Sequence, residues 1–383
     1  MKISRRSNIQ PFHAMEILRE ANAIEASGRD VWHLETGEPI TGAPKKVKEA
    51  ATKIIEKEHI GYTDALGLPE LRKRISNHYY DYYGLSISHS RIIITTGSSG
   101  GLLLSLLAAF DVSDKVIITE PAYPAYPNML KALDIVPIYC PTEQKTRFQP
   151  TVEILDSLSD KPDGLIIASP ANPTGSMLSA NEIKLLAEWC EHNDVRIIAD
   201  EIYHGVTYGN RAQTILNATD DAIIINGFSK YYAMTGWRLG WIVVPKNFVR
   251  PIERLAQNLF ISPPAISQLA ATQAFECSKE LDSNLKRYEI NRSILQASLE
   301  CSGFGSVSPA QGAFYLYVDV SPLTNNSHEF CSKMLLEAGV AATPGVDFDR
   351  NRGNKFVRFS YAGHTKDIKA AADSIKAWLK NKY

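Results

Sequence analysis

The chain has 383 residues, with 41 Lys and Arg against 42 Asp and Glu, and 44% of its residues are hydrophobic. This composition is typical of a globular protein, and the length suggests about two to three domains or one large α/β unit with an appendage. A formal net charge of -1 argues against a surface built to bind nucleic acid. No stretch approaches the ~20 apolar residues of a membrane span, so no membrane partner is expected either.

The N-terminus and the cysteines both give information about where in the cell the protein is found. The N-terminus, MKISRRSNIQPF, is basic but is not followed by an apolar stretch, so a secretory signal is not expected. The five scattered cysteines form no CxxC pair, which favours free thiols in a reducing compartment over disulfides or a zinc site. We therefore expect a cytoplasmic protein without a metal centre. The cysteines are Cys140, Cys190, Cys277, Cys301 and Cys331.

Five short runs rich in Ile and Val alternate with longer helical patterns such as 101–110 and 179–193. Because each run is apolar on both faces, it predicts a strand buried on both sides of a parallel sheet. The alternation predicts a doubly wound α/β domain. The predicted strands are residues 91–96, 115–120, 164–169, 195–200 and 222–227.

The two ends of the chain have a different texture. A long amphipathic helix is predicted over 281–301, and short strands follow at 313–320 and 355–362. The first fifty or so residues combine a helix with a loop rich in Gly and Pro. The fold class predicted is α/β, with a large, mostly parallel domain and a smaller α+β domain built from both chain ends. The expected boundaries are 1–48 for the N-terminal arm and part of the small domain, 49–284 for the large domain and 285–383 for the C-terminal small domain.

Polar residues follow each predicted strand, at the sheet edge where open α/β sheets bind ligands. After the first strand, TGSSGG opens an apolar helix whose free N–H groups can bind an anion. The plainer alternative is that Ser98 or Ser99 only caps this helix. No Walker A loop is present.

Asp200 and Lys230 follow the fourth and fifth predicted strands. A buried Asp200 would need a cationic partner. Lys230 lies in an apolar and aromatic context, GFSKYYAM, where a desolvated amine can act as a nucleophile. Solvated side chains at strand ends are the alternative for both. Arg238 could complete a phosphate site by bidentate pairing.

A serine hydrolase is a competing hypothesis, because GSSGG matches GxSxG at a strand–turn–helix junction. Ser99 would be the nucleophile, and Asp347 and His364 follow in the required order. This hypothesis gives no role to Lys230. In contrast, pyridoxal 5'-phosphate needs a phosphate site, a carboxylate beside its protonated ring nitrogen and a lysine for its aldehyde. It is the predicted cofactor.

The sequence resembles the fold type I pyridoxal-phosphate aminotransferases of class I/II, the aspartate aminotransferase superfamily. GFSKYYAMTGWRLG, which begins at Gly227, matches the lysine-site motif of this family along its whole length. PANPTG from Pro170 and ADEIYHG from Ala199 match two further central motifs in the right order and spacing. Similarity at TGEP, GAFY and VRFSYA extends the resemblance over essentially the whole chain.

The resemblance implies a role for each matched residue around the cofactor ring. Lys230 is similar to the lysine that forms the internal Schiff base and moves the proton during catalysis. Asp200 matches the partner of the ring nitrogen. Asn172 and Tyr203 match residues that bond the ring hydroxyl oxygen, and Tyr123 matches the aromatic side chain that stacks on the ring. Lys230, Asp200 and Tyr203 are therefore the predicted catalytic residues.

Further matches concern the phosphate, the substrate and a partner subunit. Arg358 resembles the arginine that binds the substrate α-carboxylate, with Gly37 and Asn172 also expected to contact the substrate. Tyr62 matches a residue that reaches the phosphate of the neighbouring subunit, which implies a homodimer with shared active sites. The phosphate itself is assigned to Ser98, Ser99 and Arg238.

The family implies a ping-pong aminotransferase that acts on an amino acid and a 2-oxo acid. C–S β-lyases share the same fold and lysine, so the sequence leaves them as an alternative. Some aspartate-selective relatives have a lysine at the position of Ser99. Its absence argues mildly against a dicarboxylic substrate.

Overall fold

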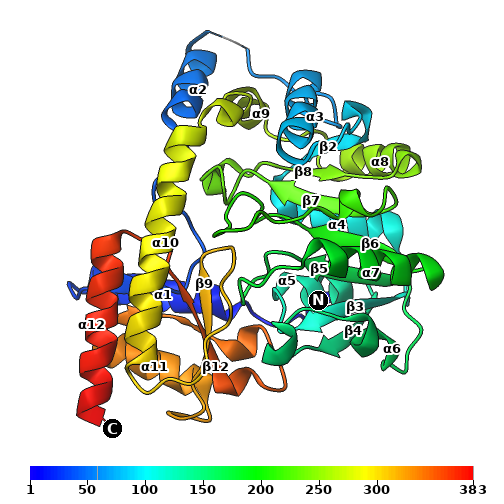
Figure 1. The fold of residues 1–383 in the computed structure, drawn as a ribbon. Helices are drawn as coiled ribbons and strands as arrows, with labels where there is room; N and C mark the ends of the chain where they lie inside the picture. Colours follow the sequence, from blue (N-terminus) through cyan, green and yellow to red (C-terminus); the bar gives the residue numbers. More distant parts are fainter. Residues whose placement is uncertain (58, 383) are drawn as a thin grey trace.

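The computed structural model describes residues 1–57 and 59–382 and contains a seven-stranded sheet with a smaller α+β domain beside it (Figure 1). The strand order is β2-β8-β7-β6-β5-β3-β4. Strand β8 is antiparallel to both of its neighbours, and the other six strands share one direction. The bounds are β2 Ile92–Thr95, β3 Lys115–Glu120, β4 Val136–Pro141, β5 Gly164–Ala168, β6 Arg196–Asp200, β7 Ile223–Gly227 and β8 Gly240–Val243.

Both faces of this sheet are covered, because alternate residues of one strand enter different hydrophobic clusters. Ile92 and Ile94 of β2 pack in the cluster that contains residues of α2, α3, α6, α7 and α9, whereas Ile93 packs with α4, α5 and α8. This two-sided burial confirms the predicted doubly wound arrangement. The helices are α2 Lys45–Lys57, α3 Pro69–Tyr83, α4 Gly97–Ala109, α5 Ala125–Ala132, α6 Val152–Asp156, α7 Ala180–His192, α8 Val249–Leu259 and α9 Ala265–Ala271.

The five predicted strands are confirmed to within one residue at each end. The strands that the sequence did not reveal are β4 and β8. Strand β4 lies at the sheet edge, contains Pro137 and Pro141, and leaves Val136 43% exposed, so it lacks a continuous apolar run. Strand β8 has only four residues and begins where the lysine motif ends, so it was not recognised as a separate strand.

The smaller domain contains a three-stranded antiparallel sheet of order β11-β12-β9. Its core packs against α10, α11 and α12, and Figure 1 shows α10 and α12 side by side. The predicted long helix and the two predicted C-terminal strands are confirmed. The bounds are α10 Ser278–Glu300, β9 Tyr315–Asp319, α11 Ser327–Ala338, β11 Thr343–Pro344, β12 Phe356–Ser360 and α12 Thr365–Lys382.

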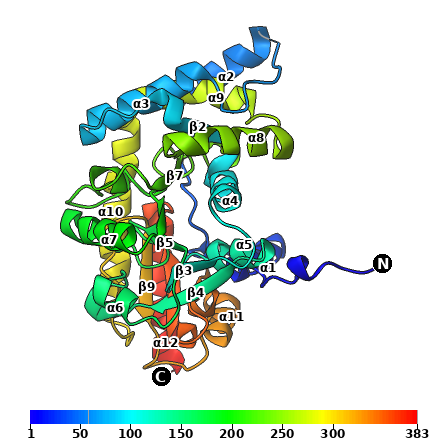
Figure 2. The ribbon, with the colours of Figure 1, turned by 90° about the vertical axis from the view of Figure 1, so that its right-hand side faces the viewer.

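The N-terminal segment packs on this smaller domain, as expected. Helix α1 (His13–Ala26) contributes Ala21 to a cluster with Leu335, and β1 (Trp32–His33) pairs in parallel with β10 (Val340–Ala341). Figure 2 shows the residues before α1 extending away from the body of the molecule. The predicted boundaries at residues 48 and 284 stay a prediction, and α10 passes through the second of them.

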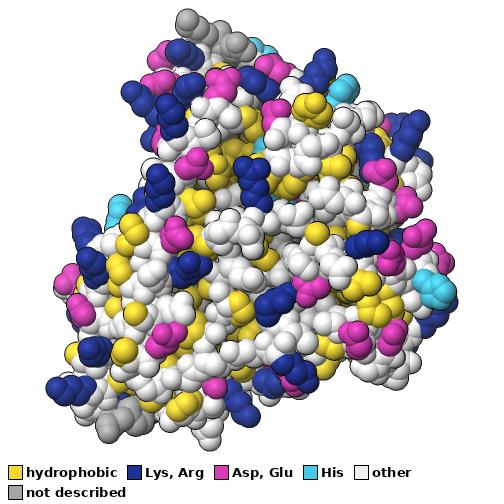
Figure 3. Space-filling view, in the orientation of Figure 1, with side chains coloured by type: hydrophobic (Ala, Val, Ile, Leu, Met, Phe, Trp, Pro, Cys, Tyr) yellow, Lys and Arg dark blue, Asp and Glu magenta, His cyan; other side chains and the backbone are white. Residues whose placement is uncertain are grey.

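The surface is mixed in charge. On the face shown in Figure 3, Lys and Arg side chains alternate with Asp and Glu. Among residues 1–57 and 59–382, no helix is long and apolar enough to cross a membrane. The five cysteines are free thiols, and all of them except Cys301 are buried.

A buried carboxylate joins the two domains near the carboxyl ends of the strands. Glu120, the last residue of β3, is 3% exposed. Its Oε1 accepts hydrogen bonds from the main-chain N–H and Nε of Arg350, at 3.2 and 3.1 Å, and its Oε2 accepts one from Asn351 at 3.2 Å. Its carbonyl accepts a bond from Arg352 at 2.7 Å. This junction holds the turn before β12 against the edge of the large sheet.

We expect Glu120→Ala to lower the free energy of unfolding by about 1–3 kcal/mol, because it leaves the N–H donors of residues 350 and 351 without an acceptor. Chemical denaturation of both variants is the measurement. Glu143→Ala, which removes an exposed partner of Lys145, is the control and should change stability far less. Equal effects of the two substitutions would contradict a role for the junction.

Candidate active site

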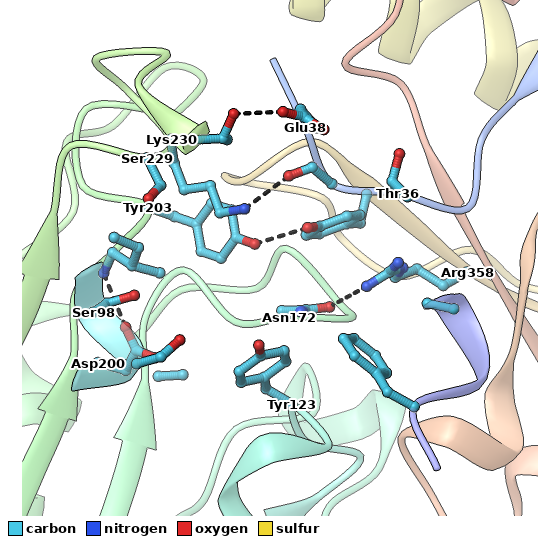
Figure 4. A pocket seen from close by; sticks show the side chains of 18 of the residues that line it. Thr36, Glu38, Ser98, Tyr123, Asn172, Asp200, Tyr203, Ser229, Lys230 and Arg358 are labelled. Carbon is cyan, nitrogen blue, oxygen red and sulfur yellow. Dashed lines mark hydrogen bonds between the residues drawn. The ribbon is translucent and has the colours of Figure 1, made fainter. Parts of the chain in front are cut away.

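A cavity of about 290 Å³ lies at the carboxyl ends of the parallel strands, between the large sheet and the smaller domain. Its wall combines strand ends of the large domain with residues 35–38, β9, β12 and the start of α1. Figure 4 shows Ser98 and Asp200 on one side of it, Arg358 on the other and Lys230 between them. Ten of the eleven predicted site residues line it: Gly37, Ser98, Ser99, Tyr123, Asn172, Asp200, Tyr203, Lys230, Arg238 and Arg358.

Lys230 extends from the turn after β7 into this cavity. Its Nζ donates a 2.8 Å hydrogen bond to the carbonyl of Gly37, and it lies 5.9 Å from the ring centre of Tyr203. Gly37 must be a glycine here, because a Cβ would lie 1.6 Å from the hydroxyl of Tyr315. The amine is thus presented to the cavity by a weak, displaceable contact with a main-chain carbonyl.

Asp200 ends β6 with its carboxylate held toward the cavity. Tyr126 donates a 2.6 Å hydrogen bond to Oδ2, and the N–H of Ile202 donates one of 3.1 Å to Oδ1. Burial raises the pKa of Asp200, while these two donors and the charge of Lys230 lower it. A carboxylate in this setting favours a cationic ligand group.

The residues that the sequence predicts to bind a phosphate come together at the N-terminus of α4. Ser98 and Ser99 lie in its first turn, where main-chain N–H groups are free to bind an anion. Arg238 comes from the turn before β8, and its Nη1 donates to the carbonyl of Thr235 at 2.9 Å. The guanidinium packs so closely on Gly97 that a Cβ there would lie 2.5 Å from Nη2. The N–H groups at the start of α4 and the guanidinium of Arg238 therefore come together at one place, although they lie next to different strands.

Arg358 is a buried cation without a carboxylate partner among the described residues. It is 2% exposed, and its guanidinium stacks over the ring of Tyr315 at 4.4 Å. Nη1 donates to Asn172 at 2.9 Å, and Nη2 donates to the carbonyl of Glu35 and to Thr343. Its Nε has no partner within the described chain. Burying an unneutralised charge is costly, so this geometry favours an anionic ligand.

Further residues of the cavity have no assignment from the sequence. Tyr126 lies in the first turn of α5, three residues after Tyr123, and this spacing is the only sequence signal for it. Tyr315 shares a 2.8 Å hydrogen bond with the hydroxyl of Tyr203 and supports Arg358. Phe12, Met15 and their neighbours on α1 also line the cavity, which the sequence could not show because they come from the far end of the chain.

Tyr62 does not line the cavity, and it is 84% exposed. The hydrolase hypothesis fails on geometry, because no histidine of residues 1–57 and 59–382 lines the cavity around Ser99. The carboxylate of Asp347 instead accepts hydrogen bonds from the N–H groups of His13 and Ala14, and His364 is exposed.

A parallel α/β sheet with a lysine, a buried carboxylate and two arginines at its carboxyl edge defines an aminotransferase-type site. The chain belongs to aminotransferase class I and II, whose sequence profile matches residues 29–375. It is 43% identical to a valine–pyruvate aminotransferase of Mycobacterium tuberculosis, over 99% of this chain and 98% of that protein. The predicted family is confirmed, and the chain is an enzyme.

Solved structures agree with this assignment. The crystal structure of an aminotransferase from Mycobacterium tuberculosis matches with a TM-score of 0.97 at 43% identity, covering 100% of each chain. Aspartate aminotransferase from Thermus thermophilus, solved with maleate, matches with a TM-score of 0.93 at 28% identity, over 98% of this chain and 99% of that one. The predicted fold class is therefore confirmed as well.

We expect Gly97→Ala to weaken binding of inorganic phosphate about tenfold, because the new Cβ displaces the guanidinium of Arg238 and Gly97 has a φ of +73°. Titration calorimetry measures the affinity. Gly236→Ala is the matched control, since a Cβ at this nearby glycine meets nothing within 4 Å. A phosphate affinity that is unchanged in Gly97→Ala would place the anion elsewhere.

Proposed function

We propose that this aminotransferase uses pyridoxal 5'-phosphate bound to Lys230, and that it transfers the amino group of an amino acid with an apolar side chain to a 2-oxo acid by a ping-pong mechanism. The observation that carries the proposal is the arrangement of three charges around one cavity. The amine of Lys230 lies between the carboxylate of Asp200 and the buried guanidinium of Arg358.

The residues present fit the cofactor at both of its ends. A phosphate matches the N–H groups at the start of α4 together with Arg238, and the close approach at Gly97 leaves the guanidinium aimed at the same place. A protonated ring nitrogen matches the buried carboxylate of Asp200. Tyr123, Asn172 and Tyr203 line the space between, where the planar ring would lie.

When bound, the cofactor supplies an aldehyde that joins amines covalently and a ring that draws electrons from the bond being broken. Asp200 keeps the ring nitrogen protonated through a charge-assisted hydrogen bond, because the burial of this carboxylate makes a cationic neighbour favourable. Lys230, as a free amine, would accept the proton of the substrate Cα as a general base and, as the ammonium so formed, would donate it to the carbon that comes from the cofactor's aldehyde group. Tyr203, whose hydroxyl is paired with Tyr315, is positioned to donate to the ring oxygen.

Arg358 binds and orients the substrate. It is fixed from three directions, by Asn172, the carbonyl of Glu35 and Thr343, so little conformational freedom is lost when it binds a carboxylate. Both half-reactions use this one site, which is the basis of ping-pong kinetics. The names of the relatives favour transamination over the β-lyase alternative.

The proposed substrate class comes from the charges of the cavity. Its only Lys and Arg side chains, within the described residues, are Lys230, Arg238 and Arg358. Each already has a role, so within one subunit no cation of the described cavity remains for a side-chain carboxylate. The start of α1 instead offers an apolar wall made of Phe12, Ala14, Met15 and Leu18. The valine–pyruvate aminotransferase that is 43% identical supports this preference.

We also propose that the enzyme is a cytoplasmic homodimer. Four apolar residues that are each at least 40% exposed lie in residues 60–62 and 259–261, and a hydrogen bond from the N–H of Thr63 to Ser262 joins these two segments. A surface of this kind is typical of an interface. The exposure of Tyr62 is consistent with a role in the partner's site. The four residues are Ile60, Tyr62, Leu259 and Ile261. Four buried free thiols favour a reducing compartment.

We expect Lys230→Ala to abolish transamination, with a loss of at least about a thousandfold in kcat, because no other lysine of the described chain lines the cavity. Single-turnover absorbance with valine is the measurement. Borohydride reduction of the wild-type enzyme followed by peptide mapping should place the cofactor on residue 230. A label on another lysine would reject the proposal, and Lys184→Ala, on the exposed face of α7, serves as the control.

We expect Met15→Arg to raise kcat/KM for glutamate relative to valine about tenfold, because it adds a guanidinium to the apolar wall of the cavity. Met15 is 53% exposed, so the longer side chain is accommodated. Met15→Gln is the control, since it changes polarity without adding charge. An unchanged ratio in Met15→Arg would show that the substrate side chain does not face α1.

A further inference from the structure

The segment that offers carbonyl groups to both Lys230 and Arg358 is held mainly by side chains. Leu34 is still anchored, through bonds of its N–H to Ala341 and of its carbonyl to the N–H of Ser360. Across the described part of the chain, residues 35–38 take part in no main-chain-to-main-chain hydrogen bond. The carbonyls of Glu35 and Gly37 nevertheless accept bonds from Arg358 and Lys230.

The side chain of Glu35 provides an anchor for this segment. It is fully buried, and its Oε1 accepts a 2.8 Å hydrogen bond from Nδ1 of His33. On the other side of the ring, Nε2 of His33 lies 3.3 Å from the carboxylate of Glu25 on α1. Both carboxylates raise the pKa of His33 to about 9, with the hydrogen bond that Glu35 accepts as the largest cause. His33 is therefore an imidazolium at neutral pH.

The second oxygen of Glu35 has no hydrogen-bond partner among the described residues. The carboxylate is thus held by one contact, to His33. A buried carboxylate that loses its only cationic partner is strongly disfavoured and must move or become protonated. Either change would shift the carbonyl of the same residue, which Arg358 and Thr343 both use as an acceptor.

We propose that His33 is a positioning residue, which acts through Glu35 to hold the carboxylate-binding guanidinium of Arg358 and to join helix α1 to the segment of residues 35–37. This role goes beyond the proposed function, because it assigns residues outside the cofactor site. It rests on the proposed function in one respect, that Arg358 is the group that binds the substrate carboxylate. His33 itself does not line the cavity, so it contacts neither substrate nor cofactor.

The first test measures binding without turnover. Titration calorimetry with 3-methylbutanoate, a carboxylate that carries no amine and cannot react, gives the dissociation constant for wild type and His33→Ala. We expect the constant to rise about tenfold, the effect of one lost charge-assisted hydrogen bond passed to the guanidinium. His89→Ala is the control, because His89 is an exposed histidine outside the cavity. An unchanged constant in His33→Ala overturns the proposal.

A double-mutant cycle separates positioning from a general loss of stability. If His33 acts through Glu35, the double variant His33→Ala/Glu35→Gln binds the carboxylate no more weakly than His33→Ala alone. Fully additive losses contradict the proposal. Turnover kinetics distinguish positioning from a loss of stability in a second way. We expect KM for valine to rise by the same factor as the dissociation constant, with kcat changed less than about threefold.

Two further outcomes keep the test decisive. His33→Gln retains an N–H donor without the charge and should give an intermediate dissociation constant, so it replaces His33→Ala if that variant does not fold. A variant that melts earlier but binds 3-methylbutanoate as wild type does shows a purely structural role and overturns the proposal. The calorimetry needs no cofactor chemistry, so failure of Lys230 to carry pyridoxal 5'-phosphate would refute the proposed function and leave this result standing.

Discussion

The structure of the site depends on one constraint, which is that charges of opposite sign are buried at separate ends of the same cavity. Arg358 is buried and Asp200 is half-buried, and neither side chain forms an ion pair within the described residues. Isolated buried charges cost several kcal/mol each unless a ligand supplies the countercharge. The free-energy cost of these unpaired charges is relieved when a ligand binds, and this relief contributes to the free energy of ligand binding. A ligand with a cationic ring and a carboxylate satisfies both ends.

The rigid part of the fold makes this arrangement possible. Asp200 is held by a central strand buried on both faces, and Lys230, Ser98 and Arg238 lie beside the ends of other strands of the same sheet. Arg358 comes from β12 of the smaller domain, and the Glu120 junction ties the turn before that strand to the large sheet. Because the two charges belong to different domains, their separation is set by packing between domains. No single motif could set it.

The sequence predicted the large domain well for a physical reason. Strands buried on both faces must be apolar throughout, which is why β2, β3, β5, β6 and β7 were recognisable. The polar residues that follow them could be brought to one edge by the rule for parallel sheets. Edge strand β4 escaped because prolines and exposure remove that signal. Tyr126 and Tyr315 escaped because their roles depend on the direction of a side chain in space, which no spacing encodes.

The substrate side of the cavity shows where sequence reasoning ends. The α1 wall and the contacts of His33 with Glu25 and Glu35 come from near the start of the chain. Arg358 lies near the other end, and its hydrogen bond to Glu35 spans 323 positions. Such contacts form only after both chain ends have packed into the smaller domain. The large domain therefore fixes the chemistry that the family shares, whereas the packing of the two chain ends fixes how the substrate carboxylate and side chain are held. Changes in α1 can then alter substrate preference without disturbing Lys230 or Asp200, since these side chains are supported by a separate core.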